Sequence, residues 1–341
     1  MAMSITPNTS PRVPSAAAPS PRRWRDLALF LGLVLLVIGG LASLAMATGW
    51  EETMAALRSL SWREINILLA LSLVNYLGRG LRWHLFATRL GLATSLLSNL
   101  RHFLGGFAMS VTPGRLGELI RMRWIARETG WSFDRTAPLV LVDRAADLAA
   151  MAILLALAIA LSASGMSGGI PVALLALGAA IIVTRPKLLH EIAGLGHRLT
   201  ARRFPRAFAR VRRAAQSLRA FSGPSMLVFA GTLGLLGWFA EGYAFHLLLV
   251  WLGADIGLWK AVGVFIFATI AGGLTGAPGG LGGAEAAMVA LLALDGVPFE
   301  IALPATLVIR VTTLWFAVLI GFAVFPWAEY QSKKSDYAME K

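Results

Sequence analysis

The sequence predicts an all-α polytopic membrane protein, and three observations lead to that fold class. Hydrophobic residues make up 57% of the 341 residues, and the mean hydropathy is +0.69. Charged residues are 14% of the chain, against about 25% in soluble domains. Apolar stretches of about 20 residues, the length that crosses a bilayer, recur along the chain. This composition excludes most soluble enzyme folds, and the absence of Cys excludes disulfides and thiol chemistry.

The N-terminal segment is rich in proline, with five prolines among Ser, Thr and Ala in residues 1–21. We expect residues 1–25 to form a disordered cytoplasmic tail. Three arginines then precede an apolar run over 27–48, which is expected to be the first span. A cleaved signal peptide is the alternative, because Ala45-Met46-Ala47 resembles a cleavage site. The run exceeds the 7–15 residues of a signal-peptide core, which favours a retained span.

Six stretches are expected to cross the membrane as helices: 27–48, 65–86, 137–161, 169–184, 225–251 and 302–325. Two further apolar stretches, 100–130 and 259–295, are interrupted by Pro and Gly. Such breaks are tolerated at membrane depth only inside protein or beside a water-filled cavity. We therefore expect both stretches to be re-entrant hairpins of two half-helices.

The distribution of basic residues predicts the orientation. If the N-terminus is cytoplasmic, the inner segments hold 24 Lys and Arg and the outer loops hold 3. This bias accounts for the net charge of +13 without nucleic acid. The expected membrane domain covers 26–326 in a bacterial inner membrane, and a second cytoplasmic tail covers 327–341. The loop 185–224 holds ten basic residues and is expected to contain a basic amphipathic helix on the cytoplasmic lipid surface.

The two interrupted stretches resemble each other, which indicates an internal repeat. Pro138 precedes Arg144 by six residues, and Pro304 precedes Arg310 by the same spacing. A span, a hairpin and a span thus occur twice, at about 65–161 and 225–325, in opposite orientations. Inverted repeats with broken helices are typical of transporters. Chance similarity between Gly-rich apolar segments is the alternative.

Charged residues within apolar stretches are the candidate site. Each costs about 2.5–3.5 kcal/mol at the bilayer centre, so it marks function by default. Half-helix N-termini and guanidinium groups both favour anions, above all phosphate. The expected headgroup-binding residues are Arg82, Arg115, Glu118, Arg121, Asp143, Arg144, Asp147, Glu241, Glu285 and Arg310. The hairpin backbone is expected to approach the ligand at Pro113, Gly114, Gly117, Pro278, Gly279, Gly280 and Gly282.

Two other interpretations of these charges remain open. In the first, the charges pair only with one another, for example Arg144 with Asp147 or Arg310 with Glu241. In the second, Asp143 and Asp147 form a catalytic carboxylate pair, an interpretation that no other motif supports. Because no metal-ligand motif and no nucleotide-binding loop occurs, we expect no metal and no cofactor.

An ordered set of motifs resembles the lysylphosphatidylglycerol synthase transmembrane family, whose members are called flippase-like, over about residues 27–325. The motifs are Arg82-Trp83, the Pro113–Glu118 stretch with Arg121, Asp143-Arg144 with Asp147, Trp238 with Glu241, the Pro278–Gly282 stretch with Glu285, and Arg310. The resemblance implies movement of a modified lipid between leaflets. Only about 15 residues follow the last expected span, so the transferase activity of bifunctional members is not implied. Many members carry an Arg where this chain has Ala284.

The expected function is therefore that of a lipid flippase, not an enzyme, which moves an anionic or amphiphilic lipid between the inner-membrane leaflets. One alternative is an accessory subunit of a lipid- or polysaccharide-modifying pathway, with a lipid-modifying enzyme as partner. The other is an intramembrane enzyme that acts on lipid-linked substrates. No ATP site is visible, so uphill transport would require an ion gradient or a partner.

Overall fold

The computed structural model describes residues 50–112, 116–162, 185–199 and 223–339, together with residue 221 and several positions between 171 and 181. Every regular element in these residues is a helix. The expected span 27–48, most of the expected span 169–184, and Pro113, Gly114 and Arg115 lie outside the described residues. So do the residues from 200 to 220, where we expected the amphipathic helix of the basic loop.

The first half of the chain forms six described helical segments. They are α2 (Trp50–Ser59), α3 (Trp62–Arg89), α4 (Leu96–Gly105), η1 (Gly106–Met109), α5 (Leu116–Thr129) and α6 (Phe133–Leu161). A capping box starts α3, because the Glu64 amide donates to the Ser61 hydroxyl and the Ser61 amide donates to the Glu64 carboxylate. The first interrupted stretch is thus helical on both sides of its break, in α4–η1 and in α5.

The second half follows a similar order. Its segments are α8 (Pro186–Leu199), α10 (Pro224–Trp251), α11 (Leu258–Leu274), η4 (Pro278–Gly280), α12 (Gly283–Leu294), α13 (Phe299–Arg310), η5 (Val311–Trp315) and α14 (Phe316–Met339). The short segment η5 is a π-helical turn that joins α13 to α14 without a break. The helix therefore continues well beyond the expected span 302–325. The second interrupted stretch is α11 and α12 with η4 between them.

Three helices in the described part of the chain are long and apolar enough to cross a membrane: Phe133–Leu161, Pro224–Trp251 and Phe299–Asp336. They coincide with the expected spans 137–161, 225–251 and 302–325. Leu258–Leu274 and Pro278–Leu294 are shorter apolar helices. The 28-residue α3 covers the expected span 65–86 but does not reach the same apolarity, because Arg79 and Arg82 lie within it.

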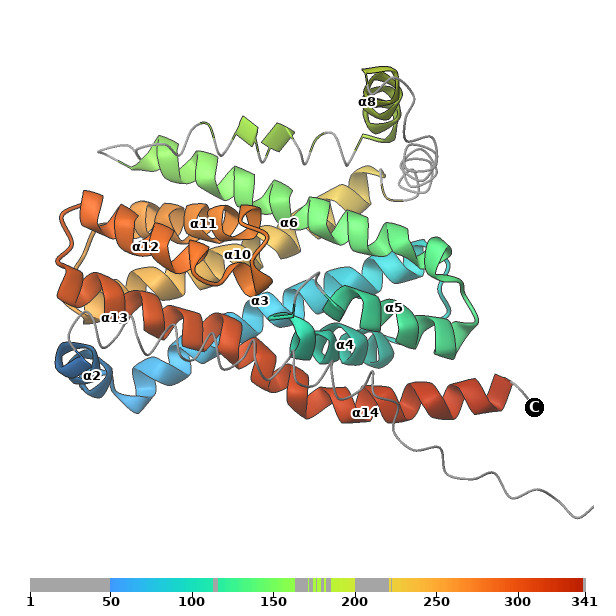
Figure 1. Ribbon diagram of the computed structural model, residues 1–341, viewed down its shortest axis with the longest axis horizontal. Coiled ribbons are helices and arrows are strands. Elements are labelled where there is room, and N and C mark those ends of the chain that lie inside the picture. Colours follow the sequence, from blue (N-terminus) through green and yellow to red (C-terminus); the bar gives the residue numbers. More distant parts are fainter. Residues whose placement is uncertain are drawn as a thin grey trace, which may run out of the picture.

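The long helices run roughly along one axis, two in each direction (Figure 1). In that view α3 and α13–α14 run from left to right, whereas α6 and α10 run from right to left. The short helices α4 and α5 lie in one half of the bundle, and α11 and α12 lie in the other. Both interrupted stretches consequently point their breaks toward the middle of the molecule.

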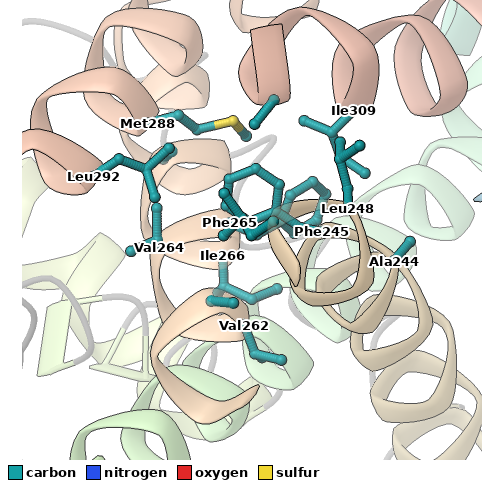
Figure 2. Close-up of a cluster of buried hydrophobic side chains, with 14 of the residues drawn as sticks. Ala244, Phe245, Leu248, Val262, Val264, Phe265, Ile266, Met288, Leu292 and Ile309 are labelled. Carbon is teal, nitrogen blue, oxygen red and sulfur yellow. The ribbon is translucent and has the colours of Figure 1, made fainter. Parts of the chain in front are cut away.

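Two hydrophobic clusters fill the two halves. The first joins α10, α11, α12 and α13, with Phe245, Phe265, Met288 and Ile309 among its buried side chains (Figure 2). The second joins α3, α4 and α6 around Trp83, Phe103 and Leu139, and it also includes Phe221. Packing of this kind holds helices together where lipid provides no hydrophobic driving force.

Glycine permits the closest helix approaches. A Cβ at Gly117 of α5 would lie 2.3 Å from the carbonyl oxygen of Gly106. A Cβ at Gly321 of α14 would lie 2.1 Å from the backbone nitrogen of Ala108. Small residues at such crossings are typical of membrane helix packing. These two contacts fix η1, and with it the first break, against α5 and α14.

Candidate functional site

The two breaks share a cavity of about 460 Å³ near the middle of the bundle. Gly117 and Glu118 line it from the first interrupted stretch, and Gly279 and Gly280 line it from the second. The stretches also touch, because a Cβ at Gly279 would lie 3.4 Å from Cγ1 of Val111. Segments some 160 residues apart in the sequence therefore form one wall of the cavity.

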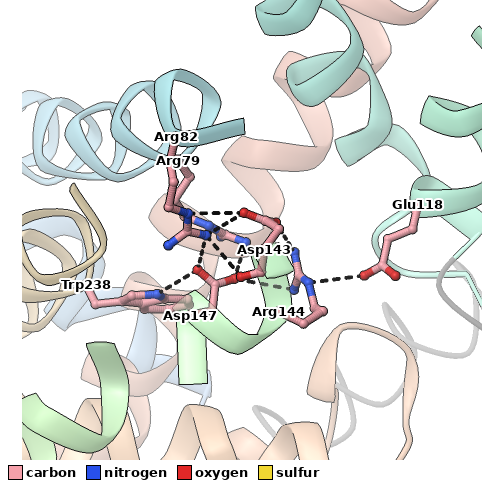
Figure 3. A network of polar contacts seen from close by, with 7 residues as sticks. All are labelled: Arg79, Arg82, Glu118, Asp143, Arg144, Asp147 and Trp238. Atoms are coloured by element: carbon pink, nitrogen blue, oxygen red, sulfur yellow. Dashed lines mark hydrogen bonds and ion pairs between the residues drawn. The ribbon is translucent and has the colours of Figure 1, made fainter. Parts of the chain in front are cut away.

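A network of arginines and aspartates lies between α3 and α6 on one side of the cavity (Figure 3). Arg79 and Arg82 share one face of α3, and Asp143 and Asp147 share one face of α6, because residues three or four apart are neighbours on a helix. Arg82 Nη2 lies 2.6 Å from Oδ1 of Asp143 and 2.6 Å from Oδ1 of Asp147. Arg79 Nη2 lies 2.7 Å from Oδ2 of Asp147.

The same network reaches two further elements. The Trp238 indole N–H on α10 donates to Oδ1 of Asp147 at 3.2 Å. Arg144 connects α6 to α5, since its Nε lies 3.3 Å from Oε1 of Glu118 (Figure 3). Arg144 also lies 3.1 Å from Oδ2 of Asp143 and 3.5 Å from Oδ2 of Asp147. The pairing of Arg144 with Asp147 that the sequence suggested is therefore present.

On the other side of the cavity, Arg310 pairs with Glu285. The Nε–Oε1 distance is 2.6 Å, and the Arg310 Nη2 donates to the Gly279 carbonyl at 2.8 Å. The suggested pairing of Arg310 with Glu241 is wrong. Glu285 lies in the first turn of α12, directly after the break, so one guanidinium binds a carboxylate of α12 and a backbone carbonyl of the preceding η4.

Glycine shapes that turn. Gly279, Gly280 and Gly282 have φ values of +61°, +69° and +79°, a backbone region in which side chains other than glycine are strained. Pro278 precedes them and starts η4. The expected hairpin glycines of the second break are thus required by the backbone, and two of them, Gly279 and Gly280, face the cavity.

Arg121 differs from the other arginines of the site. Its residue is 4% exposed, and it makes no ion pair or hydrogen bond with any described residue. Its guanidinium carbon lies 4.2 Å from the ring centroid of Phe103 and 5.6 Å from those of Trp83 and Phe107. The aromatic rings stabilise the cation without neutralising it. Arg121 therefore adds an unpaired positive charge to the cavity wall.

The cavity gathers most of the residues predicted from the sequence. Its wall includes Gly117, Glu118, Arg121, Arg144, Asp147, Glu241, Gly279, Gly280 and Arg310. Arg82, Asp143 and Glu285 are buried next to it and bind charges of the wall. Pro113, Gly114 and Arg115 lie outside the described residues.

Two wall residues on α3, Asn75 and Tyr76, were missed, and Arg79 was recognised as a charge on the same helix face as Arg82 but was not assigned to the site. Asn75, Arg79 and Arg82 follow one another at four- and three-residue steps, which was a signal available in the sequence. The Tyr76 hydroxyl donates to the Thr313 carbonyl in the π-helical turn. A π turn leaves backbone groups outside the regular helical pattern, and nothing in the sequence marked it.

The family description "Lysylphosphatidylglycerol synthase TM region" matches residues 27–321. The chain belongs to this family. A "UPF0104 membrane protein" of Methanothermobacter thermautotrophicus is 26% identical over 340 residues, which cover 91% of this chain and 98% of that protein. A second protein of the same description and organism is 30% identical over 107 residues, 31% of this chain and 32% of that protein. This lysylphosphatidylglycerol synthase TM-region protein is a multi-pass membrane protein.

The site of this TM-region protein is a mainly neutralised charge cluster with two exceptions. Four arginines and three carboxylates line the cavity. Arg79, Arg144, Arg310, Glu118 and Asp147 each have an opposite charge within 4 Å. Arg121 and Glu241 have no such partner among the described residues. Both aspartates of the suggested catalytic pair form ion pairs with Arg82. Among the described residues, no group of three or more potential metal-ligating side chains occurs.

Proposed function

We propose that this protein translocates lipid between the two leaflets of its membrane. The anionic or amphiphilic headgroup would occupy the charged cavity, and the acyl chains would remain in the surrounding lipid. Arg121 provides the main observation in support. An arginine buried at membrane depth costs about 2.5–3.5 kcal/mol, and here no described carboxylate lies within ion-pair distance of it. A phosphate-bearing headgroup would supply the missing charge and two acceptor oxygens for the guanidinium fork.

The arrangement of the helices supports a transporter architecture. Helices α3 and α10 run in opposite directions, as do α6 and α13–α14 (Figure 1), which is the relation that an inverted repeat requires. Arg101 of α4 pairs with Glu128 of α5, and Lys260 of α11 lies 2.8 Å from Asp295 after α12. Glu128 lies at the end of α5, and Lys260 and Asp295 lie at the outer ends of α11 and α12, and none of these residues lines the cavity. Charges at these ends suit re-entrant hairpins that begin and end at one membrane surface.

One edge of the cavity suits lipid tails. Leu274 lines the cavity and is 76% exposed. An exposed leucine next to a charged cavity indicates an opening toward the lipid phase rather than toward water. A lipid could therefore place its headgroup in the cavity while its chains pass beside Leu274.

The test is a leaflet-resolved assay in proteoliposomes, with phospholipid labelled on an acyl chain. Arg121→Leu should lose at least tenfold of the transport rate and keep its fold, because no ion pair is broken. The matched control is Arg63→Leu, at an exposed position in the first turn of α3 that forms no ion pair with a described residue. Transport at the wild-type rate by Arg121→Leu would end the headgroup-binding role of this residue. A chemically altered lipid after incubation would favour the intramembrane enzyme instead.

A further inference from the structure

Glu241 is the second group of the cavity that lacks an opposite charge. It lies near the middle of α10, is 4% exposed and faces the cavity. No described lysine, arginine or histidine lies within ion-pair distance of its carboxylate. Helix α10 packs most extensively on α3, so Glu241 lies where the two expected repeat units meet.

The charged and titratable neighbours of Glu241 come from four elements. Helix α3 contributes Tyr76 and Arg79, α6 contributes Asp147, α13 contributes Arg310, and α12 contributes Glu285 behind Arg310. The described part of α11 adds no titratable side chain to the wall. Arg79 is 2.7 Å from Asp147, and Arg310 is 2.6 Å from Glu285. Both nearby cations therefore already bind another carboxylate.

The charge on Glu241 is coupled to the charge of whatever fills the cavity. Burial disfavours the charged form of an acid, and a second nearby negative charge disfavours it further. A headgroup that fills a 460 Å³ cavity lies close to every charge on its wall. An anionic headgroup would therefore strengthen proton binding at Glu241. Because linkage is reciprocal, the proton would strengthen binding of the headgroup by the same factor.

We propose that Glu241 carries one proton per anionic headgroup, so that the protein is a proton–lipid symporter. This inference rests on the proposed lipid translocation. A hydronium ion on the entry side gives its proton to a Glu241 carboxylate oxygen, and the O–H bond breaks when water accepts that proton on the exit side. A headgroup with one negative charge then crosses with no net charge. The pH gradient drives the cycle, and the membrane potential does not.

The first experiment uses proteoliposomes of phosphatidylcholine with a trace of phosphatidylglycerol labelled on an acyl chain. A pH difference of one unit is imposed, and potassium with valinomycin holds the potential at zero. For one proton per lipid, the probe should accumulate about tenfold in the leaflet on the alkaline side. With Glu241→Gln, the probe should become evenly distributed between the two leaflets. Glu300→Gln, at an exposed position at the start of α13, is the matched control and should keep the tenfold ratio.

The outcomes separate the two proposals. If wild-type protein moves the probe but the leaflet ratio stays at one, symport is wrong and translocation stands. If wild-type protein does not move the probe, the translocation of anionic lipid fails and symport fails with it. A retained tenfold ratio in Glu241→Gln would overturn the role of this residue.

A second measurement does not depend on transport or on a folded variant. Wild-type protein labelled with ¹³C-glutamate is mixed in detergent with short-chain phosphatidylglycerol, and infrared difference spectra are recorded. Symport predicts that the C=O band of a protonated glutamate grows when the lipid binds. Binding without any change in the glutamate carboxyl bands would overturn the coupling.

Discussion

The pair of Arg310 and Glu285 offers a quantitative test of the second break. Arg310 is 7% exposed and Glu285 is 3% exposed, and their closest atoms are 2.6 Å apart. Replacing Arg310 by Leu leaves the Glu285 carboxylate buried without its partner and removes the donor to the Gly279 carbonyl. Breaking one side of a buried ion pair costs about 3–5 kcal/mol. Arg310→Leu should therefore lower the free energy of unfolding by about this amount.

The double variant separates pairing from lipid binding. Removing both charges is often neutral when the replacements are apolar and of similar volume, so Arg310→Leu with Glu285→Leu should recover most of the lost stability. Denaturant unfolding in a mild detergent measures both values. The double variant with Glu241→Leu in place of Glu285→Leu is the control and should not recover. Equal stability of the Arg310→Leu single variant and the wild type would refute the reasoning, and so would recovery only with Glu241→Leu.

Three further predictions follow from packing, topology and the C-terminal helix. Gly321→Ala should lose about 1–3 kcal/mol in thermal unfolding because its Cβ would overlap the backbone of Ala108. Gly231→Ala, within α10 and with open space around it, should instead gain about 0.4–1 kcal/mol. A single Cys at Ser217 should resist impermeant thiol reagents in intact cells; labelling from outside would contradict the charge-based orientation. Glu329 joins the C-terminal part of α14 to α5, because its carboxylate binds Arg127 at 2.9 Å and Trp124 at 2.9 Å. If this contact restrains the movement of the two halves, Glu329→Gln should speed lipid transport in the proteoliposome assay. An unchanged rate would exclude the contact as a restraint.

Hydropathy predicted the position of a helix well where a proline or glycine in the sequence marks its ends. Pro224 is the first residue of α10, and Gly253 with a positive φ follows its end, so the expected span 225–251 differs by one residue. The end of α14 was not marked in this way. Its polar extension is stabilised by Glu329, which binds side chains of α5 about 200 residues earlier. Such a long-range contact leaves no trace in a local apolar pattern.

In the candidate site, too, local features could be predicted from the sequence and long-range contacts could not. Spacing along a helix predicted that Asp143 and Asp147 share one face, because helical geometry alone decides it. The choice of Glu285 or Glu241 as the partner of Arg310 depends on how the turn after Gly279 folds back toward α13. Charge and spacing allow either choice, and only the arrangement in space selects Glu285. The unpaired state of Arg121 and Glu241 is likewise a property of their surroundings.

The described ion pairs indicate which parts can move together. Within the expected repeat units 65–161 and 225–325, every ion pair joins residues of the same unit, as in Arg82–Asp143 and Arg310–Glu285. Inside the bundle, the side-chain hydrogen bonds between described residues of the two units include those of Trp238 to Asp147 and of Tyr76 to the Thr313 carbonyl. The described ion pairs between the two halves of the chain all involve the extension of α14 beyond residue 325. Two internally ion-paired units that meet mainly through apolar packing can rock against each other, which alternating access requires. Arg121 then belongs to one unit and Glu241 to the other, so relative motion of the units would change the distance between the arginine proposed to bind the headgroup and the acid proposed to bind the proton.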